Sequence, residues 1–203
     1  MNALFCLACY LFGALPIGYL VVRWREKRDI RDIGSRSTGA ANVLRTAGWA
    51  LALPVLLVDV SKGLLPVLLG RHVFPGQPLM PLLGSLAAVL GHCYPVTLRF
   101  RGGKGVAAAM GAFAGLGFHA SLLSLAVFLC VILLTRFVSL GSLLAAVSYP
   151  FFRLALGTAP DTLLWAWWAA LLAVIVIRHW GNIRRLLAGQ ERKFGRRARE
   201  AAG

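Results

Sequence analysis

Long apolar runs, each close to the length that crosses a bilayer, fill most of this sequence. A helix needs about 20 apolar residues to span a hydrocarbon core roughly 30 Å thick. Hydrophobic residues make up 59% of the 203 residues, and yet the net charge is +15. An ordinary soluble domain does not combine these properties. The sequence therefore predicts a polytopic, all-α membrane helix bundle, with residues 1–203 forming one integral membrane domain.

Seven membrane crossings are predicted from the spacing of these runs. The run 106–134 is too long for one crossing and too short for two ordinary ones. Its glycines, including Gly117, predict two short or tilted helices that meet near Phe118 and His119. The other crossings are expected at 3–22, 49–69, 79–98, 140–156 and 162–177.

The cations predict the topology of these crossings. No cation precedes the first run, whereas Arg23 follows it at once, as expected for a retained helix with an outside N-terminus. All but three of the 22 Lys and Arg residues then fall in segments 23–48, 99–105, 136–139 and 178–203. The positive-inside rule places these segments and the C-terminus in the cytoplasm. Attraction to anionic membrane lipids explains the basic tail better than nucleic-acid binding, because the tail lacks interleaved aromatic residues.

The segment 91–105, GHCYPVTLRFRGGKG, carries the strongest candidate for anion binding. Glycines let the backbone amides of Gly102, Gly103 and Gly105 turn toward a ligand, at the start of a helix whose dipole favours negative charge. Lys104 would supply a full positive charge. Neither Ser nor Thr follows this lysine, so a magnesium-nucleotide loop is not expected. The alternative is a membrane turn whose cations only set the topology.

The first cytoplasmic segment has hydrogen-bond donors and a cation suited to phosphate. Within 32–45, DIGSRSTGAANVLR, the hydroxyls of Ser35 and Ser37 and the amide of Asn42 could donate to phosphate oxygens, and Arg45 could hold two oxygens at once. The alternative is that Ser37 or Thr38 caps the next helix, which we favour for Thr38.

The last motif, 178–191, RHWGNIRRLLAGQE, places His179 and Asn182 three residues apart on one helical face. Arg185 lies one turn further along, on a segment that could lie on the membrane surface. The sequence contains no HExxH motif, Cys/His cluster or GxSxG turn, so neither a metal nor a cofactor is predicted.

Asp59 and Lys62 form a second pattern, within a predicted crossing. They lie three residues apart and so share a helical face. Charges at membrane depth point into the bundle, where this pair would act either as a structural brace or along a substrate path.

Taken together, the motifs GSRSTGAANVLR, GHCYPVTLRFRGGKG, TRFVSLGS and RHWGNIRRLLAGQE resemble the bacterial acyl-phosphate-dependent glycerol-3-phosphate acyltransferase family, the PlsY type, over most of the chain. The resemblance implies a seven-helix enzyme of the bacterial inner membrane whose active site faces the cytoplasm. It would transfer a fatty acyl group from acyl phosphate to the 1-hydroxyl of glycerol 3-phosphate, giving lysophosphatidic acid and phosphate.

The resemblance also implies roles for individual residues. Ser35 and Arg45 would bind phosphate and orient the substrates, and Glu191 would hold the fold together. The glycine loop 102–105, with Lys104, would bind phosphate, and His179 and Asn182 would complete the site.

The first motif departs from the family pattern. The family usually has Gly-Asn at Arg36 and Ser37 and Thr at Ala41. The lost amide and hydroxyl could each be worth about 1 kcal/mol.

Acyl phosphate is an activated anhydride, so no covalent nucleophile is required. We expect the glycerol hydroxyl to attack directly, with its proton passing to a substrate phosphate oxygen or to His179. Two rival functions are an anion or phosphate-metabolite transporter, with the glycine loop as its filter, and a noncatalytic scaffold.

Overall fold

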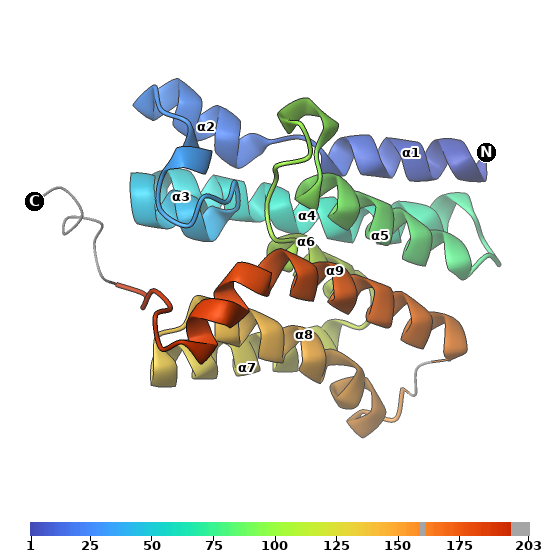
Figure 1. Cartoon of the computed structure of the whole chain (residues 1–203). Helices are drawn as coiled ribbons and strands as arrows, with labels where there is room; N and C mark the ends of the chain where they lie inside the picture. The colour runs from blue at the N-terminus through green and yellow to red at the C-terminus, as the bar shows by residue number, and fades with distance from the viewer. Residues whose placement is uncertain (159–160, 196–203) are drawn as a thin grey trace, which may run out of the picture.

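The computed structural model describes residues 1–158 and 161–195, and the structure of this part of the chain is entirely helical (Figure 1). The last basic residues of the tail, within 196–203, lie outside the described residues. In chain order the elements are α1 Asn2–Gly13, α2 Ile17–Glu26, the 3-10 helix η1 Ile30–Asp32, α3 Ala40–Ala47, α4 Trp49–Val73, α5 Leu79–Cys93, the 3-10 helix η2 Val96–Leu98, α6 Val106–Leu116, α7 Phe118–Thr135, α8 Val138–Ala155 and α9 Thr162–Leu187.

The first predicted crossing is broken into α1 and α2. Pro16 lacks a backbone N–H and disfavours a helical conformation at Leu15, so the helix ends after Gly13 and restarts at Ile17. The crossing predicted at 3–22 lies within Asn2–Glu26, which is long and apolar enough to cross a membrane, but the segment is not one continuous helix. Beyond the break, Val22 of α2 packs with Val43 of α3 and Val55 of α4 in a second hydrophobic core.

Six segments in the described part of the chain are long and apolar enough to cross a membrane. The segment containing α1 and α2 counts as one of them. The helix α6 has 11 residues, which is short for a crossing. A membrane helix bundle is thus confirmed, while the count of seven crossings stays a prediction.

Two boundaries within the apolar runs bear on the site. The predicted break near Phe118 and His119 is confirmed, since α6 ends at Leu116 and α7 begins at Phe118. The last crossing was predicted to end at Ile177, with His179 and Asn182 on a helical face beyond it, and α9 continues as one helix to Leu187. Charged residues mark the end of the apolar run there, but arginine and leucine are good helix formers and extend the same helix beyond it.

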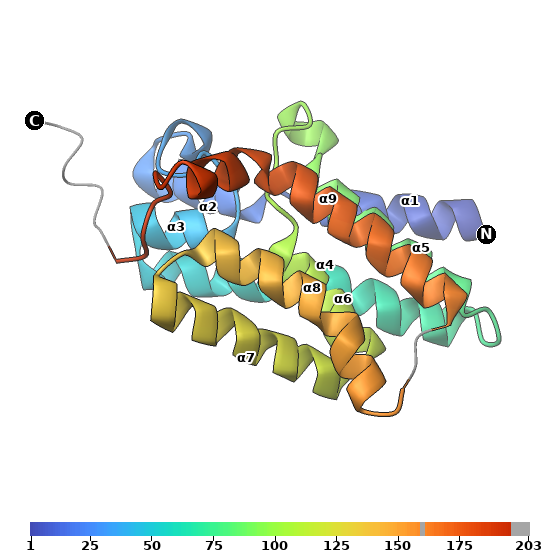
Figure 2. The same ribbon diagram turned by 60° about the horizontal axis from the view of Figure 1, so that its bottom comes forward.

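The helices form two groups. Figures 1 and 2 show α1, α4 and α5 side by side in one group and α7, α8 and α9 in the other, with α6 packed against α4 between them. The main core joins the groups, because the Phe113 ring of α6 stacks on Tyr149 of α8 with ring centroids 4.0 Å apart. Its edge contact with Trp167 of α9 adds a third helix at 5.9 Å.

Glycines allow α4 and α6 to pack at backbone distance. A Cβ at Gly63 would overlap the carbonyl oxygen of Ala108, and a Cβ at Gly111 would overlap that of Val60. Close approach through small residues is the usual way in which membrane helices associate, because the bilayer supplies no hydrophobic drive between them. The short α6 is held in place in this way.

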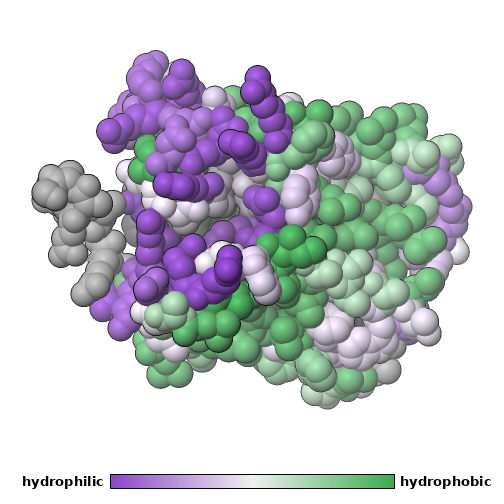
Figure 3. Space-filling model, in the orientation of Figure 1, coloured by the Kyte–Doolittle hydropathy of each residue, from purple (hydrophilic) through white to green (hydrophobic). Residues whose placement is uncertain are grey.

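The surface divides into polar and apolar regions (Figure 3). Hydrophilic side chains gather at the end of the molecule where α2, α3 and the C-terminal end of α9 lie, and hydrophobic side chains cover much of the rest of this view. Large apolar side chains such as Leu134 and Leu133 are 85% and 79% exposed. Exposure on this scale identifies the surface that faces lipid.

Candidate active site

The glycine loop and the end of α9 meet through one short hydrogen bond. The Nζ atom of Lys104 donates to the Oδ1 atom of Asn182 over 2.6 Å. Lys104 lies in the loop before α6, whereas Asn182 is buried on α9, 78 residues later in the chain. Three cytoplasmic segments were predicted to carry site residues: the first loop, the glycine loop and the segment 178–191. The last two therefore converge at this contact.

Glu191 fixes the orientation of Asn182. After α9 the chain turns back at Gly189, with φ +67°, and the buried Glu191 accepts three hydrogen bonds. Oε1 accepts from Asn182 Nδ2 at 2.7 Å and from Ser139 Oγ at 3.0 Å, and Oε2 accepts from Arg185 Nε at 2.8 Å. Because the amide nitrogen of Asn182 is bound to Glu191, its oxygen faces Lys104.

These contacts also govern the charge of the carboxylate. Burial alone would raise the pKa of Glu191, but the three hydrogen bonds that it accepts outweigh burial and hold the pKa below its usual value. Glu191 is thus an anion near neutral pH. Ser139, its partner from α8, was not predicted as a site residue, because nothing in the local sequence connects it to a position 52 residues away.

The amides of Gly102 and Gly103 do not face a ligand, contrary to the prediction. Gly102 N–H donates to Cys93 O at 3.2 Å, and Gly103 N–H donates to His92 O at 3.0 Å. Their carbonyls accept from Arg178, whose Nη2 and Nε lie 2.9 Å from Gly102 O and Gly103 O. The loop is therefore a fixed platform, held by the end of α5 on one side and by α9 on the other.

The sequence also predicted an anion site at the N-terminus of the helix that follows the glycine loop, and the start of α6 is compatible with this prediction. Gly105 is the N-cap of α6, with φ +81°, and no side chain caps the helix. The first N–H groups of a helix and its dipole attract anions. Lys104 directly precedes this N-terminus, so a helix end and an ammonium group are adjacent.

The first cytoplasmic loop is folded around Asn42, which is 1% exposed. Its Oδ1 accepts from Ser35 N–H at 2.8 Å, and its Nδ2 donates to the carbonyls of Ile30, Ile33 and Ser37. The prediction that this amide donates to phosphate was wrong, because burial makes Asn42 the core of the loop. The loop in turn fixes the backbone at Ser35.

The predicted cap of the following helix was also wrong. The N-cap of α3 is Gly39, not Ser37 or Thr38, and no side chain caps the helix. Ser37 is 8% exposed, and its Oγ accepts weakly from Gly39 N–H at 3.4 Å. This places Ser37 inside the loop.

The C-terminal segment joins the first loop to the Lys104–Asn182 contact. Arg192, next to Glu191, donates from Nη1 to the carbonyl oxygen of Gly34, beside Ser35. Arg192 was not predicted as a site residue. The first cytoplasmic loop is thus connected to the glycine loop and to α9 through the segment that follows α9.

Positive charge exceeds negative charge around these contacts. Burial lowers the pKa of Arg45, and Glu191 opposes this shift. Burial also lowers the pKa of Lys104, to about 8, with nearby Arg185 and Arg45 adding to the effect. Several cations thus share one carboxylate, and an added anion would relieve their repulsion.

This low pKa predicts that anion binding weakens in mild alkali. Lys104 is charged below about pH 8, so the affinity for inorganic phosphate should fall as pH rises from 8 to 10. We expect a decrease of up to about tenfold per pH unit, measured as phosphate-dependent thermal stabilisation. Lys104→Arg should bind with little dependence on pH over this range, because arginine stays charged. A wild-type affinity that is constant to pH 10 would contradict the assignment.

His179 lies one helical turn before Asn182 and is 2% exposed. Its Nδ1 lies 2.9 Å from the carbonyl oxygen of Ile175. A carbonyl oxygen can only accept, so Nδ1 carries the hydrogen, and Nε2 has a free lone pair when the ring is neutral. His179 can therefore take up a proton at Nε2.

Asp59 and Lys62 point into the bundle, as predicted. Lys62 Nζ lies 2.8 Å from Asp59 Oδ1, and the side chains are 2% and 3% exposed. Lys62 also donates to Leu15 O at the α1–α2 break, over 2.7 Å. The pair is a buried ion pair that makes no direct contact with Lys104 or Asn182 among the described residues.

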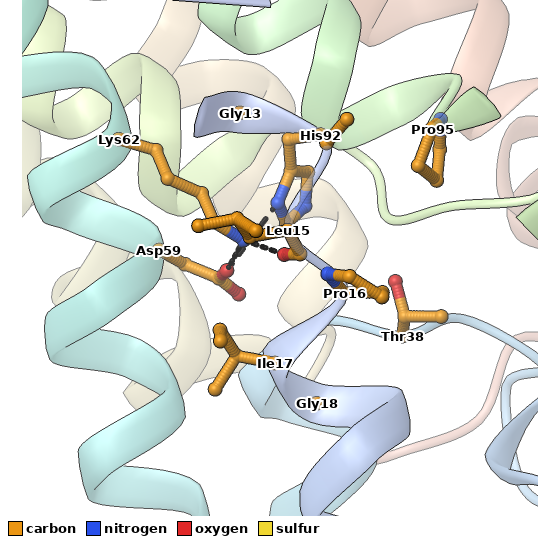
Figure 4. Close-up of a pocket in the computed structure, with 11 residues that line it drawn as sticks. Gly13, Leu15, Pro16, Ile17, Gly18, Thr38, Asp59, Lys62, His92 and Pro95 are labelled. Carbon is orange, nitrogen blue, oxygen red and sulfur yellow. Dashed lines mark hydrogen bonds and ion pairs between the residues drawn. The ribbon is translucent and has the colours of Figure 1, made fainter. Parts of the chain in front are cut away.

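Two cavities can be described. One, of about 10 Å³, lies at the α1–α2 break beside Asp59, Lys62 and His92 (Figure 4). The other, of about 360 Å³, lies between the far ends of the helices and is lined in part by Arg71 and Arg153. Neither cavity is lined by Lys104 or Asn182.

Comparison with known proteins identifies the family. The model of the family described as glycerol-3-phosphate acyltransferase matches residues 3–189. The chain belongs to this family. Among its glycerol-3-phosphate acyltransferase relatives, the protein of Synechococcus sp. (strain CC9605) is 46% identical over 94% of this chain and 92% of the relative. That of Geobacter sulfurreducens is 41% identical over 91% and 93%.

Solved structures agree with the family assignment. The crystal structure of the integral membrane glycerol 3-phosphate acyltransferase PlsY, in its glycerol 3-phosphate form, has a TM-score of 0.89. The two chains are 34% identical, and the match covers 96% of each. The lysophosphatidic acid form of PlsY has a TM-score of 0.86 at the same identity, covering 96% of this chain and 95% of PlsY.

One departure from the usual motif of glycerol-3-phosphate acyltransferases has a structural consequence. Arg36, at the position where the resemblance leads us to expect glycine, has φ +56°, in the left-handed region. Glycine adopts this conformation freely, whereas a side chain costs about 1 kcal/mol or more. The first cytoplasmic loop therefore carries a local backbone strain at Arg36.

Proposed function

We propose that this protein transfers a fatty acyl group from acyl phosphate to the 1-hydroxyl of glycerol 3-phosphate, releasing lysophosphatidic acid and phosphate. The observation that carries the proposal is the Lys104–Asn182 hydrogen bond. It joins the glycine loop to the last motif in a region where cations outnumber carboxylates. Both substrates are anions, so a region with excess positive charge suits both of them.

Family membership supports the acceptor and the product. The similar PlsY structures were solved in a glycerol 3-phosphate form and in a lysophosphatidic acid form. Acyl phosphate as the donor rests on the resemblance of the motifs and on the chemistry of the residues. Within the site, Lys104 and the uncapped start of α6 would hold a phosphate group, and Arg45 and Ser35 would hold the second phosphate or orient it.

The reaction needs one new bond and one broken bond. The glycerol oxygen attacks the acyl carbon, and the bond between that carbon and the phosphate oxygen breaks, so the phosphate leaves with the bonding electrons. The hydroxyl proton passes to Nε2 of His179 or to a phosphate oxygen. Lys104 and Arg45 stabilise the negative charge that develops on the leaving phosphate.

The protein would work at the inner face of a bacterial cytoplasmic membrane. Support comes from the hydrophilic side chains that gather where α2, α3 and the C-terminal end of α9 lie (Figure 3), and from the Lys and Arg residues of these segments. Arg45 lies on α3, and Glu191 follows α9. A single membrane domain over residues 1–203 agrees with a family match that begins at residue 3 and ends at residue 189. The acyl chain would enter from the lipid that surrounds the bundle.

The proposal is tested by offering two donors side by side. Purified protein with glycerol 3-phosphate should form lysophosphatidic acid from palmitoyl phosphate and at least tenfold less from palmitoyl-CoA. Ser35→Ala should reduce the rate about tenfold or more, in line with one lost hydrogen bond to a charged group. Ser61→Ala is a matched control, because that hydroxyl donates only to Val58 O within α4.

The opposite results point to the rival functions. No product with either donor would overturn the acyltransferase proposal. Uptake of labelled glycerol 3-phosphate into proteoliposomes without any donor would support a transporter instead.

A further inference from the structure

A second group of buried polar side chains lies apart from the Lys104–Asn182 contact. Asp59 and Lys62 of α4 and His92 of α5 are 2%, 1% and 6% exposed. His92 Nδ1 lies 3.4 Å from Asp59 Oδ1, the same oxygen that accepts from Lys62 at 2.8 Å. Figure 4 shows the three side chains converging from two helices. Charged groups at membrane depth are costly and are retained where they have a role. The reaction as proposed uses none of the three.

His92 connects this cluster to the glycine loop. Its carbonyl oxygen accepts from Gly103 N–H at 3.0 Å. Its ring lies directly against Gly103, where a Cβ would overlap Nε2. The ring therefore contacts Asp59 on one side and the loop on the other. Lys104 follows Gly103 in the chain. The ring therefore fixes the backbone from which the Lys104 side chain extends.

Lys62 connects the same cluster to the first cytoplasmic loop. It donates to Leu15 O, a carbonyl at the break between α1 and α2 that also accepts from Ile17 N–H at 3.0 Å. Thr97, in the segment that leads to the glycine loop, donates to Ala14 O at 3.3 Å. Beyond the break, Gly18 of α2 packs against the carbonyl of Thr38, next to the segment that carries Ser35.

One cavity lies where these connections meet. The cavity of about 10 Å³ is lined by Leu15 and Pro16 of the break, Thr38 of the first loop, and the cluster itself (Figure 4). Its volume is at the lower limit of what one water molecule requires. Such tight packing transmits a displacement of the cluster to both loops.

We propose that Asp59, Lys62 and His92 are positioning residues that fix the glycine loop and the first cytoplasmic loop relative to each other around bound phosphate. The ion pair holds the helix break, and the ring of His92, oriented by Asp59, supports Gly103. This inference rests on the proposed function, and it assigns to the cluster an influence on substrate binding.

Three His92 variants test the proposal, because each leaves the Asp59–Lys62 ion pair intact. Asp59→Asn is avoided, since a buried lysine without its counter-charge can prevent folding. His92→Phe keeps a ring beneath Gly103 and loses the contact with Asp59. His92→Asn keeps a donor for Asp59 and loses the ring. His92→Ala loses both. Ser85→Ala is the matched control, because Ser85 is a buried polar residue of α5 that bonds only to Leu82 O.

The measurements are KM for each phosphate substrate, kcat, and thermal stability. We expect His92→Ala to raise KM for at least one substrate about tenfold, with kcat within about threefold of wild type. His92→Phe and His92→Asn should each raise the same KM by a smaller factor, and Ser85→Ala should leave it unchanged.

Other results would overturn the proposal. If kcat falls in proportion to the lost thermal stability and both KM values stay unchanged, the cluster only stabilises the fold and does not position the substrates. A wild-type KM in His92→Phe would show that ring packing suffices without the charges. Stabilisation of each variant by inorganic phosphate provides a readout without turnover. The two proposals can fail separately. If the wild type forms no product but is stabilised by phosphate, and His92→Ala is not stabilised, the acyltransferase proposal is refuted and the positioning proposal stands.

Discussion

Lys104→Ala is expected to lower kcat/KM for glycerol 3-phosphate by about a hundredfold to a thousandfold, which corresponds to roughly 3 to 4 kcal/mol of lost stabilisation. The ammonium is partly buried and lies beside the N-terminus of α6, where water screens charge poorly. Alanine removes the cation and leaves Asn182 Oδ1 without its donor. The measurement is steady-state acyl transfer from palmitoyl phosphate by the purified variant.

Two variants control for this loss. Lys104→Arg keeps the charge and should retain more activity than alanine. Lys193→Ala removes an exposed lysine that lies over the Phe137 ring, and it should behave as wild type. Activity of Lys104→Ala within threefold of wild type would exclude the glycine loop as the phosphate site.

Glu191→Ala should cost about a hundredfold in kcat/KM, although we do not expect this residue to contact a substrate. Without the carboxylate, Asn182 Nδ2 and Ser139 Oγ lose their acceptor, and only the Lys104 contact is left to orient the Asn182 amide. The amide is then held from one side only, so the position of Lys104 becomes less well defined. Unmet buried donors also cost about 1 to 3 kcal/mol each, so the melting temperature should fall.

Glu191→Gln separates orientation from charge. Its amide oxygen can still accept from Asn182 and Ser139, whereas its NH₂ group faces Arg185. We expect a loss of about tenfold, between wild type and alanine, since one ionic hydrogen bond is worth about 1.5 to 3 kcal/mol. Glu26→Gln, at an exposed end of α2, is the neutral control. Equal activities of the glutamine and alanine variants would show that the charge, and not the amide orientation, is what matters.

The structure of the site shows where local sequence was sufficient. The spacing of His179 and Asn182 was enough to predict a shared helical face, because a helix repeats every 3.6 residues, whereas the burial of that face was not predicted. The ion pair Asp59–Lys62 followed from the same rule. Both predictions depend only on the geometry of one helix.

Predictions that required a partner from elsewhere in the chain were less successful. Asn42 and the amides of Gly102 and Gly103 carry the right donors for phosphate, yet the fold uses them to hold loops together. Ser139 and Arg178 attracted no specific prediction, although they bind Glu191 and the glycine loop. A donor in a sequence cannot reveal which acceptor the fold brings near it.

The sequence by itself determined that this chain is a membrane helix bundle with its cations at one end, because the length of an apolar run and the sign of the flanking charge are local properties. Only the tertiary structure decided that Lys104 contacts Asn182, that Glu191 orients that amide, and that His92 links a buried ion pair to the glycine loop. These contacts depend on how helices pack across the bundle, and packing is determined by the shapes of many side chains at once.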